Sequence, residues 1–349
     1  MRRMTPPGVA ARHHLPMPVL PASFRAYVVD KPADGTFSRG LRDLTPDDLP
    51  PGELTIRVEW SSVNFKDGLA ARADGKVARV YPLVAGIDLA GEVVASEDDA
   101  FPVGSKVVAN GYDIGTARHG GFGELARIPS DWAVPLPRGL TTRDAMAIGT
   151  AGFTAAMSVD ALERHGLKPG DGPVLVTGAA GGVGSTAIAI LAARGHEVWA
   201  ATGKPDEMDR LRDLGATEFL TRDEVVAPGR PLESARWAGA VDTVGSATLP
   251  YVLRTLRLGA AVASSGNASG AELHTTVFPF ILRGVSLLGM DSANLPIGPR
   301  RTLWARLSDD LLPRGIEDGI TEVDLDTLEP ALDAIADGQA RGRWVVRVS

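Results

Sequence analysis

A glycine-rich turn limits the fold of this chain more than any other feature of its sequence. The turn reads GAAGGVG at residues 178–184. It directly follows the apolar segment Pro173–Thr177, and an Ala- and Ile-rich stretch, Val183–Arg194, starts within it. A strand, a glycine turn and a helix in this order form the usual site for the pyrophosphate of a dinucleotide. The pattern therefore predicts a dinucleotide-binding fold, and an ordinary strand–helix connection is the alternative.

Each glycine of the turn has a predicted task. Gly178 would permit the tight exit from the strand, and Gly181 would let the backbone approach the pyrophosphate. Gly184 would let the helix pack closely on the sheet, while the first amides of the helix face the anion. Gly182 belongs to the same predicted cofactor turn.

The segments around the turn predict an α/β protein with two domains, which agrees with a length of 349 residues. Short apolar runs separated by Gly, Pro and Asp extend from Phe24 to about Pro137 and predict a β-rich domain. A helix-rich stretch follows at Arg143–Glu163. Strands and helices then alternate, which is typical of a doubly wound parallel sheet. The predicted strands are Pro173–Thr177, Glu197–Ala201, Phe219–Leu220, Gly239–Thr243 and Ala260–Ser264, with helices at Val183–Arg194, Glu207–Leu214 and Leu249–Leu258. Helices at Arg300–Leu311 and Leu328–Asp337 and a strand at Trp344–Val348 complete the prediction.

Composition excludes several classes of function. The chain has no cysteine, so no disulfide, thiolate nucleophile or Cys-ligated zinc is expected, and we predict no metal site. A net charge of −7 argues against a nucleic-acid or anionic-membrane partner. No continuous apolar run has the roughly 18 to 20 residues of a membrane span. Residues 1–22 are rich in proline and lack an apolar signal-peptide core, so we predict a disordered extension on a cytoplasmic protein.

The end of the second predicted strand bears on the choice of nicotinamide cofactor. NAD-binding folds usually place a carboxylate there for the ribose hydroxyl. This chain has Thr202, Gly203 and Lys204 instead, and Arg222 follows the third strand. A hydroxyl and two cations suit a 2′-phosphate, so we predict NADPH. In the alternative interpretation Lys204 and Arg222 are solvated surface charges.

Several further blocks resemble one known family. They are WSSVNFKD at 60–67, PLVAGIDLAG at 82–91, IGTAGFTA at 148–155, VTGAAGGVGST at 176–186, WAGAVDTVG at 237–245, TTVFPFILR at 275–283 and GMDS at 289–292. In this order they resemble the zinc-free quinone-oxidoreductase branch of the medium-chain dehydrogenase/reductase superfamily, and in particular the acrylyl-CoA reductases and YhdH-type quinone oxidoreductases. The similarity runs from about residue 24 to residue 349.

The resemblance implies a GroES-like β-rich catalytic domain interrupted by a Rossmann domain. We expect the disordered extension at 1–22, the catalytic domain at 23–148, the NADPH-binding domain at 149–287 and a return to the catalytic domain at 288–349. Besides the cofactor residues already named, the resemblance implies cofactor contacts at seven further positions. They are Phe65, Val183, Ser185, Thr186, Gly266, Phe280 and Asp291. Phe65 stands where we expect the family's tyrosine, so a hydroxyl is missing there. The alternative for Phe280 is a position in the core, and the alternative for Asp291 is a structural cap.

For the chemistry we expect four polar residues in the cleft: Asn64, Asp67, Asp88 and Arg343. Zinc members of the superfamily place a metal ligand near the position of Asp88, after Gly86. Arg343 could compensate the carboxylates, and a purely structural Asp–Arg ion pair is an equal alternative.

The implied reaction is hydride transfer from NADPH to an activated double bond, as in acrylyl-CoA, followed by protonation of the enolate. Arg300, Arg301 and Arg306 are candidates for the phosphates of the thioester carrier, with a solvated helix face as the alternative. An NADPH quinone or enone reductase is the first rival function, and a non-catalytic NADPH-binding sensor or scaffold the second. The apolar run at 285–289 near the end of the nucleotide domain would suit pairing with a second copy, so a homodimer is expected.

Overall fold

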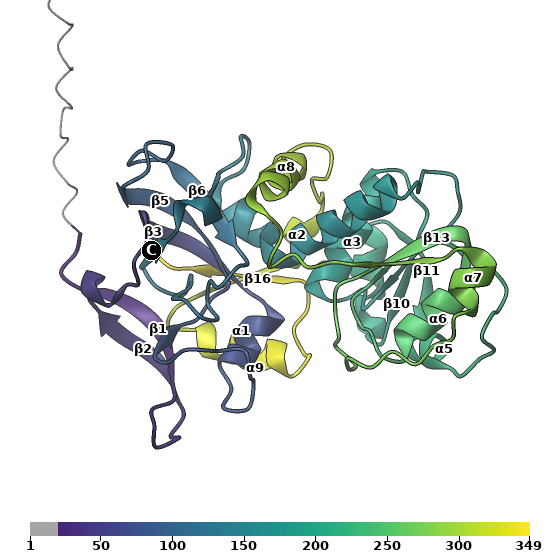
Figure 1. The fold of residues 1–349 in the computed structure, drawn as a ribbon, viewed down its shortest axis with the longest axis horizontal. Helices are drawn as coiled ribbons and strands as arrows, with labels where there is room; N and C mark the ends of the chain where they lie inside the picture. Colours follow the sequence, from purple (N-terminus) through teal and green to yellow (C-terminus); the bar gives the residue numbers. More distant parts are fainter. Residues whose placement is uncertain (1–19) are drawn as a thin grey trace, which may run out of the picture.

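The computed structural model describes residues 20–349, so the extension predicted at residues 1–22 lies outside the described residues except for its last three. Two lobes lie side by side, with α2 and α3 close to their junction (Figure 1). The C-terminus lies in the first lobe, next to β3, although the second lobe comes from the middle of the chain (Figure 1). This arrangement is the one expected for a catalytic domain interrupted by a nucleotide-binding domain.

The first lobe is built on two sheets. A three-stranded sheet has the order β2-β1-β4, and a seven-stranded sheet has the path β15-β16-β3-β5-β6-β8, with β7 paired to β3. Apolar side chains of β3 at positions 54, 56 and 58 are fully buried on the core side. The elements are β1 (Phe24–Asp30), β2 (Ser38–Leu44), β3 (Leu54–Val63), α1 (Phe65–Ala70), β4 (Leu83–Val84), β5 (Asp88–Ser96), β6 (Lys106–Asn110), β7 (Leu125–Ile128), β8 (Val134–Pro135), β15 (Ile320–Asp324), α9 (Leu328–Ala336) and β16 (Arg343–Arg347).

The second lobe is a parallel six-stranded sheet of order β11-β10-β9-β12-β13-β14, which confirms the predicted doubly wound topology. Its strands are β9 (Val174–Thr177), β10 (Val198–Thr202), β11 (Ala216–Thr221), β12 (Trp237–Asp242), β13 (Leu256–Ser264) and β14 (Ser286–Gly289). Its helices are α3 (Gly182–Ala193), α4 (Met208–Asp213), α5 (Arg222–Val226), α6 (Thr248–Thr255) and α7 (Phe278–Arg283). Strand order reverses between β9 and β12, and ligands of such sheets bind at that point.

Two helices differ from their predicted limits by more than one residue. The segment predicted as a helix over Leu249–Leu258 ends at Thr255, and β13 begins at Leu256. The residues predicted as the last helical turn belong to the sheet instead. Leu256 is fully buried and pairs with Trp237 of β12. The helix predicted at Arg300–Leu311 is α8 (Ile297–Leu307). Its earlier start includes Pro299, because proline is tolerated in a first helical turn.

Helix α2 (Thr142–Arg164) runs between the lobes and packs mainly on α3, β3 and β5. By length and composition it is the one helix among residues 20–349 that could span a membrane, yet 78% of its most apolar window is buried inside the protein. Gly149 interrupts it with φ 51°, a conformation that favours glycine. This break brings the chain at residues 149–150 close to the polar residues described below.

The last strand returns to the first lobe. Strand β16 pairs antiparallel with β3, with Trp344 opposite Val63 and Val345 opposite Ser62. This pairing places Arg343 beside the end of β3, from which Asn64 follows directly. The domain limits remain predictions, and a limit at residue 287 would cut β14, which ends at Gly289.

Candidate active site

The glycine turn after β9 has little room for side chains at two of its positions. A Cβ atom at Gly178, which has φ 61°, would lie 2.2 Å from Thr243 Oγ1. A Cβ atom at Gly184 would lie 2.4 Å from the carbonyl oxygen of Gly178, so α3 packs directly on the turn. Gly181 is exposed, and a Cβ atom there would meet only that same carbonyl, at 3.3 Å. The turn thus presents bare backbone at the start of a helix, which suits a pyrophosphate.

A pocket of about 320 Å³ opens beside this turn. Its wall contains the predicted cofactor residues Thr202, Gly203, Lys204 and Arg222. The remaining lining residues are Thr177, Gly178, Ala180, Gly181, Ala201, Val225, Val244, Thr248, Ala268, Ser269 and Gly338. Two cations and a hydroxyl therefore line a cavity at the carboxyl ends of β9, β10 and β12. The residues fit a dinucleotide that carries a second phosphate on its adenosine ribose.

Lys204 also contacts the C-terminal segment of the chain. Its Nζ donates a hydrogen bond of 2.9 Å to the carbonyl oxygen of Ala340. Burial lowers the pKa of the Lys204 ammonium, and the nearby positive charge of Arg341 lowers it further. The cofactor pocket therefore has a wall that the first lobe supplies.

A buried polar cluster lies where the two lobes meet, and it consists of Asn64, Asp67, Asp88 and Arg343. The carboxylate of Asp88 accepts hydrogen bonds from Ser62 Oγ at 2.5 Å and Asn64 Nδ2 at 2.8 Å. It accepts two more from Thr150, whose backbone N lies at 2.8 Å and whose Oγ1 lies at 2.5 Å. These donors compensate the loss of solvent around a fully buried carboxylate.

Asn64 and Asp67 hold the start of α1. One oxygen of Asp67 accepts from the backbone N of Asn64 at 2.8 Å, and the other accepts from the backbone N of Ile87 at 2.8 Å. Asn64 is the residue that precedes the first helical turn, and Asp67 lies within that turn. Burial, followed by repulsion from Asp88, raises the pKa of Asp67 to about 7.

Arg343 supplies the positive charge of the cluster. Its Nε donates to the carbonyl oxygen of Ala147 at 2.9 Å, and its Nη1 lies 3.4 Å from Asn64 Oδ1. Burial lowers the pKa of the guanidinium, while the charges of Asp88 and Asp67 oppose that shift. The guanidinium also adjoins the cofactor turn, since a Cβ atom at Gly182 would lie 3.2 Å from Arg343 Nη1. The cluster and the turn are therefore in direct contact.

None of the other predicted cofactor residues lines the pocket beside the turn. Phe65 follows Asn64 and is 44% exposed. Val183 is half-buried, whereas Ser185 and Thr186 are buried, and Thr186 Oγ1 bonds back to the carbonyl of Gly182 at 2.8 Å.

Gly266, Phe280 and Asp291 do not line the pocket beside the turn. A Cβ atom at Gly266 would lie 2.1 Å from the carbonyl oxygen of Thr243, which by itself requires glycine. Phe280 packs against the core cluster around β13 and α6. Asp291 accepts from Asn294 Nδ2 at 2.8 Å within its own loop, as a structural cap would.

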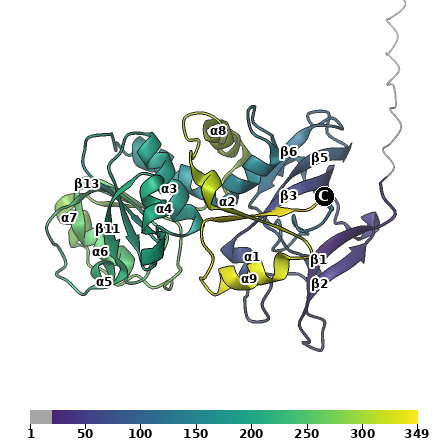
Figure 2. The same cartoon turned by 180° about the vertical axis from the view of Figure 1, so that it is seen from behind.

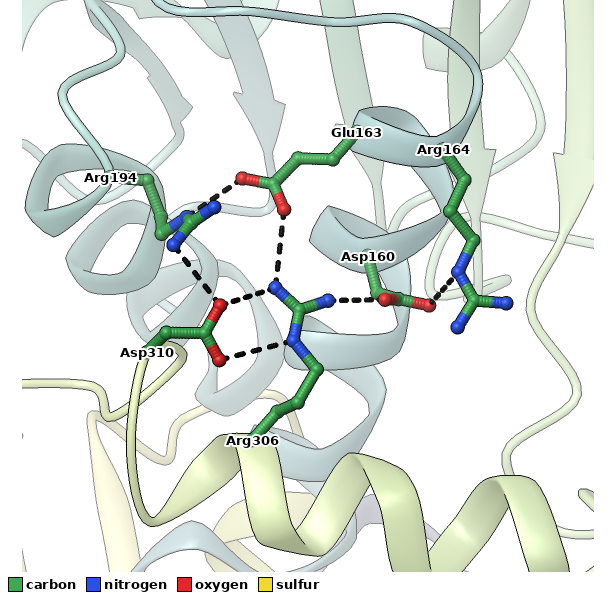
Figure 3. A network of polar contacts seen from close by, with 6 residues as sticks. All are labelled: Asp160, Glu163, Arg164, Arg194, Arg306 and Asp310. Atoms are coloured by element: carbon green, nitrogen blue, oxygen red, sulfur yellow. Dashed lines mark hydrogen bonds and ion pairs between the residues drawn. The ribbon is translucent and has the colours of Figure 1, made fainter.

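The arginines considered for the phosphates of a thioester carrier do not form a cluster. Arg300 is fully buried, donates to the carbonyl oxygen of Asn110 at 2.7 Å, and lies with its guanidinium carbon 4.4 Å from the ring centre of Tyr112. Arg306 is in an ion-pair network with Asp160, Glu163 and Asp310 (Figure 3). The structure contradicts a three-arginine phosphate site, because internal partners engage Arg300 and Arg306, and the alternative of a solvated helix face describes only Arg301.

Sequence reasoning missed three residues that adjoin the buried cluster: Ser62, Gly149 and Thr150. A Cβ atom at Gly149 would lie 2.5 Å from Arg343 Nη2 and 2.7 Å from Asp88 Oδ2. The signal was present as a Gly-Thr pair inside an otherwise apolar helix. Among residues 20–349 no group of three or more His, Cys, Asp or Glu side chains is arranged to hold a metal ion.

Comparison with family models agrees with both lobes. Residues 50–138 match the family model of the alcohol dehydrogenase GroES-like domain, and residues 182–308 match that of zinc-binding dehydrogenases. The first match covers much of the seven-stranded sheet, and the second covers α3 to α8.

Similar proteins align over nearly their whole length. The acrylyl-CoA reductase AcuI of Ruegeria pomeroyi is 51% identical over 93% of this chain and 99% of its own. The putative quinone oxidoreductase YhfP of Bacillus subtilis is 44% identical, with the same coverage. The structure of the YhdH oxidoreductase of Salmonella enterica in complex with NADP is 45% identical, with a TM-score of 0.90 over 93% of this chain and 100% of that one.

Proposed function

Since this chain belongs to the family of acrylyl-CoA reductases and YhdH- and YhfP-type oxidoreductases, we propose that it reduces acrylyl-CoA to propanoyl-CoA with NADPH. The 51% identity to an acrylyl-CoA reductase, over 93% of the chain, carries this proposal. NADPH as the cofactor rests on the cations Lys204 and Arg222 in the pocket and on the NADP complex of a relative.

The bound cofactor would supply a hydride from nicotinamide C4 to the β-carbon of the substrate, and a proton would then reach the α-carbon. The protein's part is to align the two partners and to exclude competing water. We propose that Gly178, Gly181 and the first turn of α3 hold the pyrophosphate. Thr202, Lys204 and Arg222 would bind the 2′-phosphate.

The four residues of the buried cluster are proposed as positioning residues. Asp67, Asp88 and Arg343 are buried and bond to backbone groups, to the side chain of Asn64 and to neighbouring hydroxyls. Through these bonds the cluster ties the start of α1 to the break in α2, and Arg343 lies beside the start of α3. Phe65 is the exposed neighbour that would contact cofactor or substrate. A Phe65→Tyr variant, which restores the expected hydroxyl, should change KM more than stability.

The substrate is tested by comparing acrylyl-CoA, crotonyl-CoA and a simple quinone as oxidants of NADPH with purified protein. The proposal expects the highest kcat/KM for acrylyl-CoA. A quinone preferred by orders of magnitude would overturn it in favour of the alternative, an NADPH quinone or enone reductase. The identity to YhfP, a putative quinone oxidoreductase, keeps that alternative open.

The cofactor is tested with Arg222→Gln, which removes one of the two predicted phosphate-binding cations. A hydrogen bond to a charged group contributes about 1.5–3 kcal/mol, so kcat/KM for NADPH should fall by about 10- to 150-fold. The value for NADH should hardly change. As a matched control, Arg212→Gln removes an exposed arginine of α4 that does not line the pocket. Equal losses for both cofactors would contradict a 2′-phosphate contact.

We also propose a cytoplasmic homodimer in which β14 and α7 face a second copy. Strand β14 is at one end of the six-stranded sheet. Beside it α7 exposes several large apolar side chains, with Ile281 at 67% and Leu282 at 59%. An unpaired strand edge next to an apolar helix face is a suitable surface for symmetric pairing.

Light scattering of the purified protein tests the dimer. Ile281→Glu should convert it to a monomer, because a charge would be buried at the centre of the pairing surface. Val103→Glu, in the first lobe, is the matched control, since Val103 is also exposed and apolar. A monomeric wild-type protein would contradict the proposal.

A further inference from the structure

A loop from the first lobe reaches the cofactor pocket of the second. The loop consists of residues 338–342 and connects α9 to β16. Gly338 lines the pocket together with Lys204 and Arg222. The carbonyl oxygen of Ala340 accepts the 2.9 Å hydrogen bond from Lys204 Nζ. The loop is therefore part of the pocket wall on the side of the two predicted phosphate-binding cations.

Arg341 extends from this loop to the second lobe. Its guanidinium pairs with Asp206 and, at 3.3 Å, with Glu207, the residues that follow Lys204 by two and three positions. Glu207 is shared with Arg210, whose Nε lies 2.7 Å from it, so Asp206 is the less occupied of the two carboxylates. Arg341 and Asp206 are both 55% exposed, and the positive charge of Arg341 lowers the pKa of Lys204. The guanidinium thus lies at the rim of the pocket, close to the ammonium.

From this placement we propose that Arg341 is a specificity-determining residue, which joins Lys204 and Arg222 in recognising the 2′-phosphate of NADPH. The inference rests on the proposed use of NADPH. A guanidinium matches the geometry of a phosphate, and a phosphate with nearly two negative charges attracts it more strongly than an exposed carboxylate does. Asp206 holds Arg341 near the pocket and competes with the phosphate for it.

A purely structural role makes a different prediction. If Arg341 only fastens the loop to the second lobe, Arg341→Gln and Asp206→Asn break the same ion pair and should act alike. If Arg341 binds the phosphate, the two variants act in opposite directions. Arg341→Gln then removes a cation from the phosphate, while Asp206→Asn frees that cation and removes a repelling charge.

The experiment measures the dissociation constants of 2′,5′-ADP and 5′-AMP by titration calorimetry, and kcat/KM with NADPH and NADH. Arg341→Gln should weaken 2′,5′-ADP binding about 10-fold, in line with one charge-assisted hydrogen bond, and leave 5′-AMP unchanged. Asp206→Asn should tighten 2′,5′-ADP binding by about 3-fold, as expected for one exposed charge. Arg212→Gln serves as the control, because Arg212 is likewise 55% exposed and ion-paired within α4.

Two results would overturn the inference. One is a change in the same direction for Arg341→Gln and Asp206→Asn, and the other is an equal loss for 2′,5′-ADP and 5′-AMP. Both are separable from failure of the proposed cofactor. A wild-type protein that prefers NADH to NADPH contradicts the proposed function, whereas a wild-type preference for NADPH that Arg341→Gln leaves intact contradicts only the role of Arg341.

Discussion

Two groups of charged side chains differ in their exposure to solvent. One is the buried polar cluster, and the other is the ion network around Arg306. In the cluster, Arg343 faces Asp67 and Asp88, and all three are buried. In the network, Arg306 and Arg194 bridge α2, the end of α3 and the turn after α8 (Figure 3). The side chains of that network are partly exposed, with Arg306 at 25%.

The difference shows why similar charges contribute differently to the free energy of unfolding. In the network, water and salt screen each charge, so the groups that remain after one pair is broken are solvated by water. In the cluster, solvent cannot replace a lost partner. A buried carboxylate without a compensating group therefore destabilises the folded protein. Figure 2 shows α2, α3 and α8 from behind. The network fastens these elements together, while the cluster lies beside the cofactor turn.

Replacing Arg343, whose positive charge faces both buried carboxylates, should have the largest effect on stability. Arg343→Met would leave Asp67 and Asp88 without their cation and should lower the free energy of unfolding by about 3–5 kcal/mol. Urea denaturation followed by circular dichroism measures it. Arg343→Lys keeps the charge and should lose less. A loss below about 1 kcal/mol for Arg343→Met would place the cluster in the same class as a surface pair.

Thr150→Val tests the hydrogen bonds of the cluster without changing its formal charge. The variant keeps the side-chain shape but removes the Oγ1 donor to Asp88. A hydrogen bond to a charged group contributes about 1.5–3 kcal/mol, and urea denaturation should show a loss of that size. Thr302→Val, on the exposed side of α8, provides the comparison and should change stability little. Equal effects at the two sites would contradict the importance of burial.

Asp67 should give the stability of the cluster a pH dependence near neutral pH. Its pKa of about 7 in the folded protein lies above the usual value of about 3.8 for an aspartate, so the native state binds the proton more tightly. The resulting stability is present below about pH 4 and is lost as pH rises through about 7. For one proton the slope is at most about 1.4 kcal/mol per pH unit.

Unfolding free energies of wild type and Asp67→Asn between pH 5 and 8 check this prediction. The wild type should lose stability relative to the variant as pH rises. His119, His196 and Asp242 also have shifted pKa values, but they are the same in both proteins. A constant difference between the two proteins would show that Asp67 is ionised throughout this range.

The smallest effect is expected in the network of Figure 3. Arg306→Gln should lower stability by about 1 kcal/mol or less at low salt, and the loss should shrink in 1 M NaCl. Arg164→Gln is the control within the same network, because Arg164 is more exposed and pairs only with Asp160. A loss for Arg306→Gln that matches that of Arg343→Met would remove the distinction between the two regions.

Local sequence determined the nucleotide-binding lobe. The turn at residues 178–184 and the alternation of strands and helices are short-range patterns, and backbone conformation and packing at Gly178 and Gly184 require glycine. Thr202, Lys204 and Arg222 follow strands whose carboxyl ends meet at one edge of a parallel sheet, so their convergence in one pocket was predictable.

The tertiary structure alone decided which charges are paired, and with what. Arg300 and Arg301 are adjacent in sequence, yet the first is fully buried among backbone carbonyls and the second is exposed. Asp88 and Thr150 lie far apart along the chain, and a break in α2 at Gly149 brings them together. Arg341 reaches Asp206 only because β16 returns to the first lobe after the second is complete. The sequence by itself determined the fold and the cofactor turn, since these depend on local conformation and periodicity. The partners of each charge depend on burial and on long-range chain return, which only the folded protein defines.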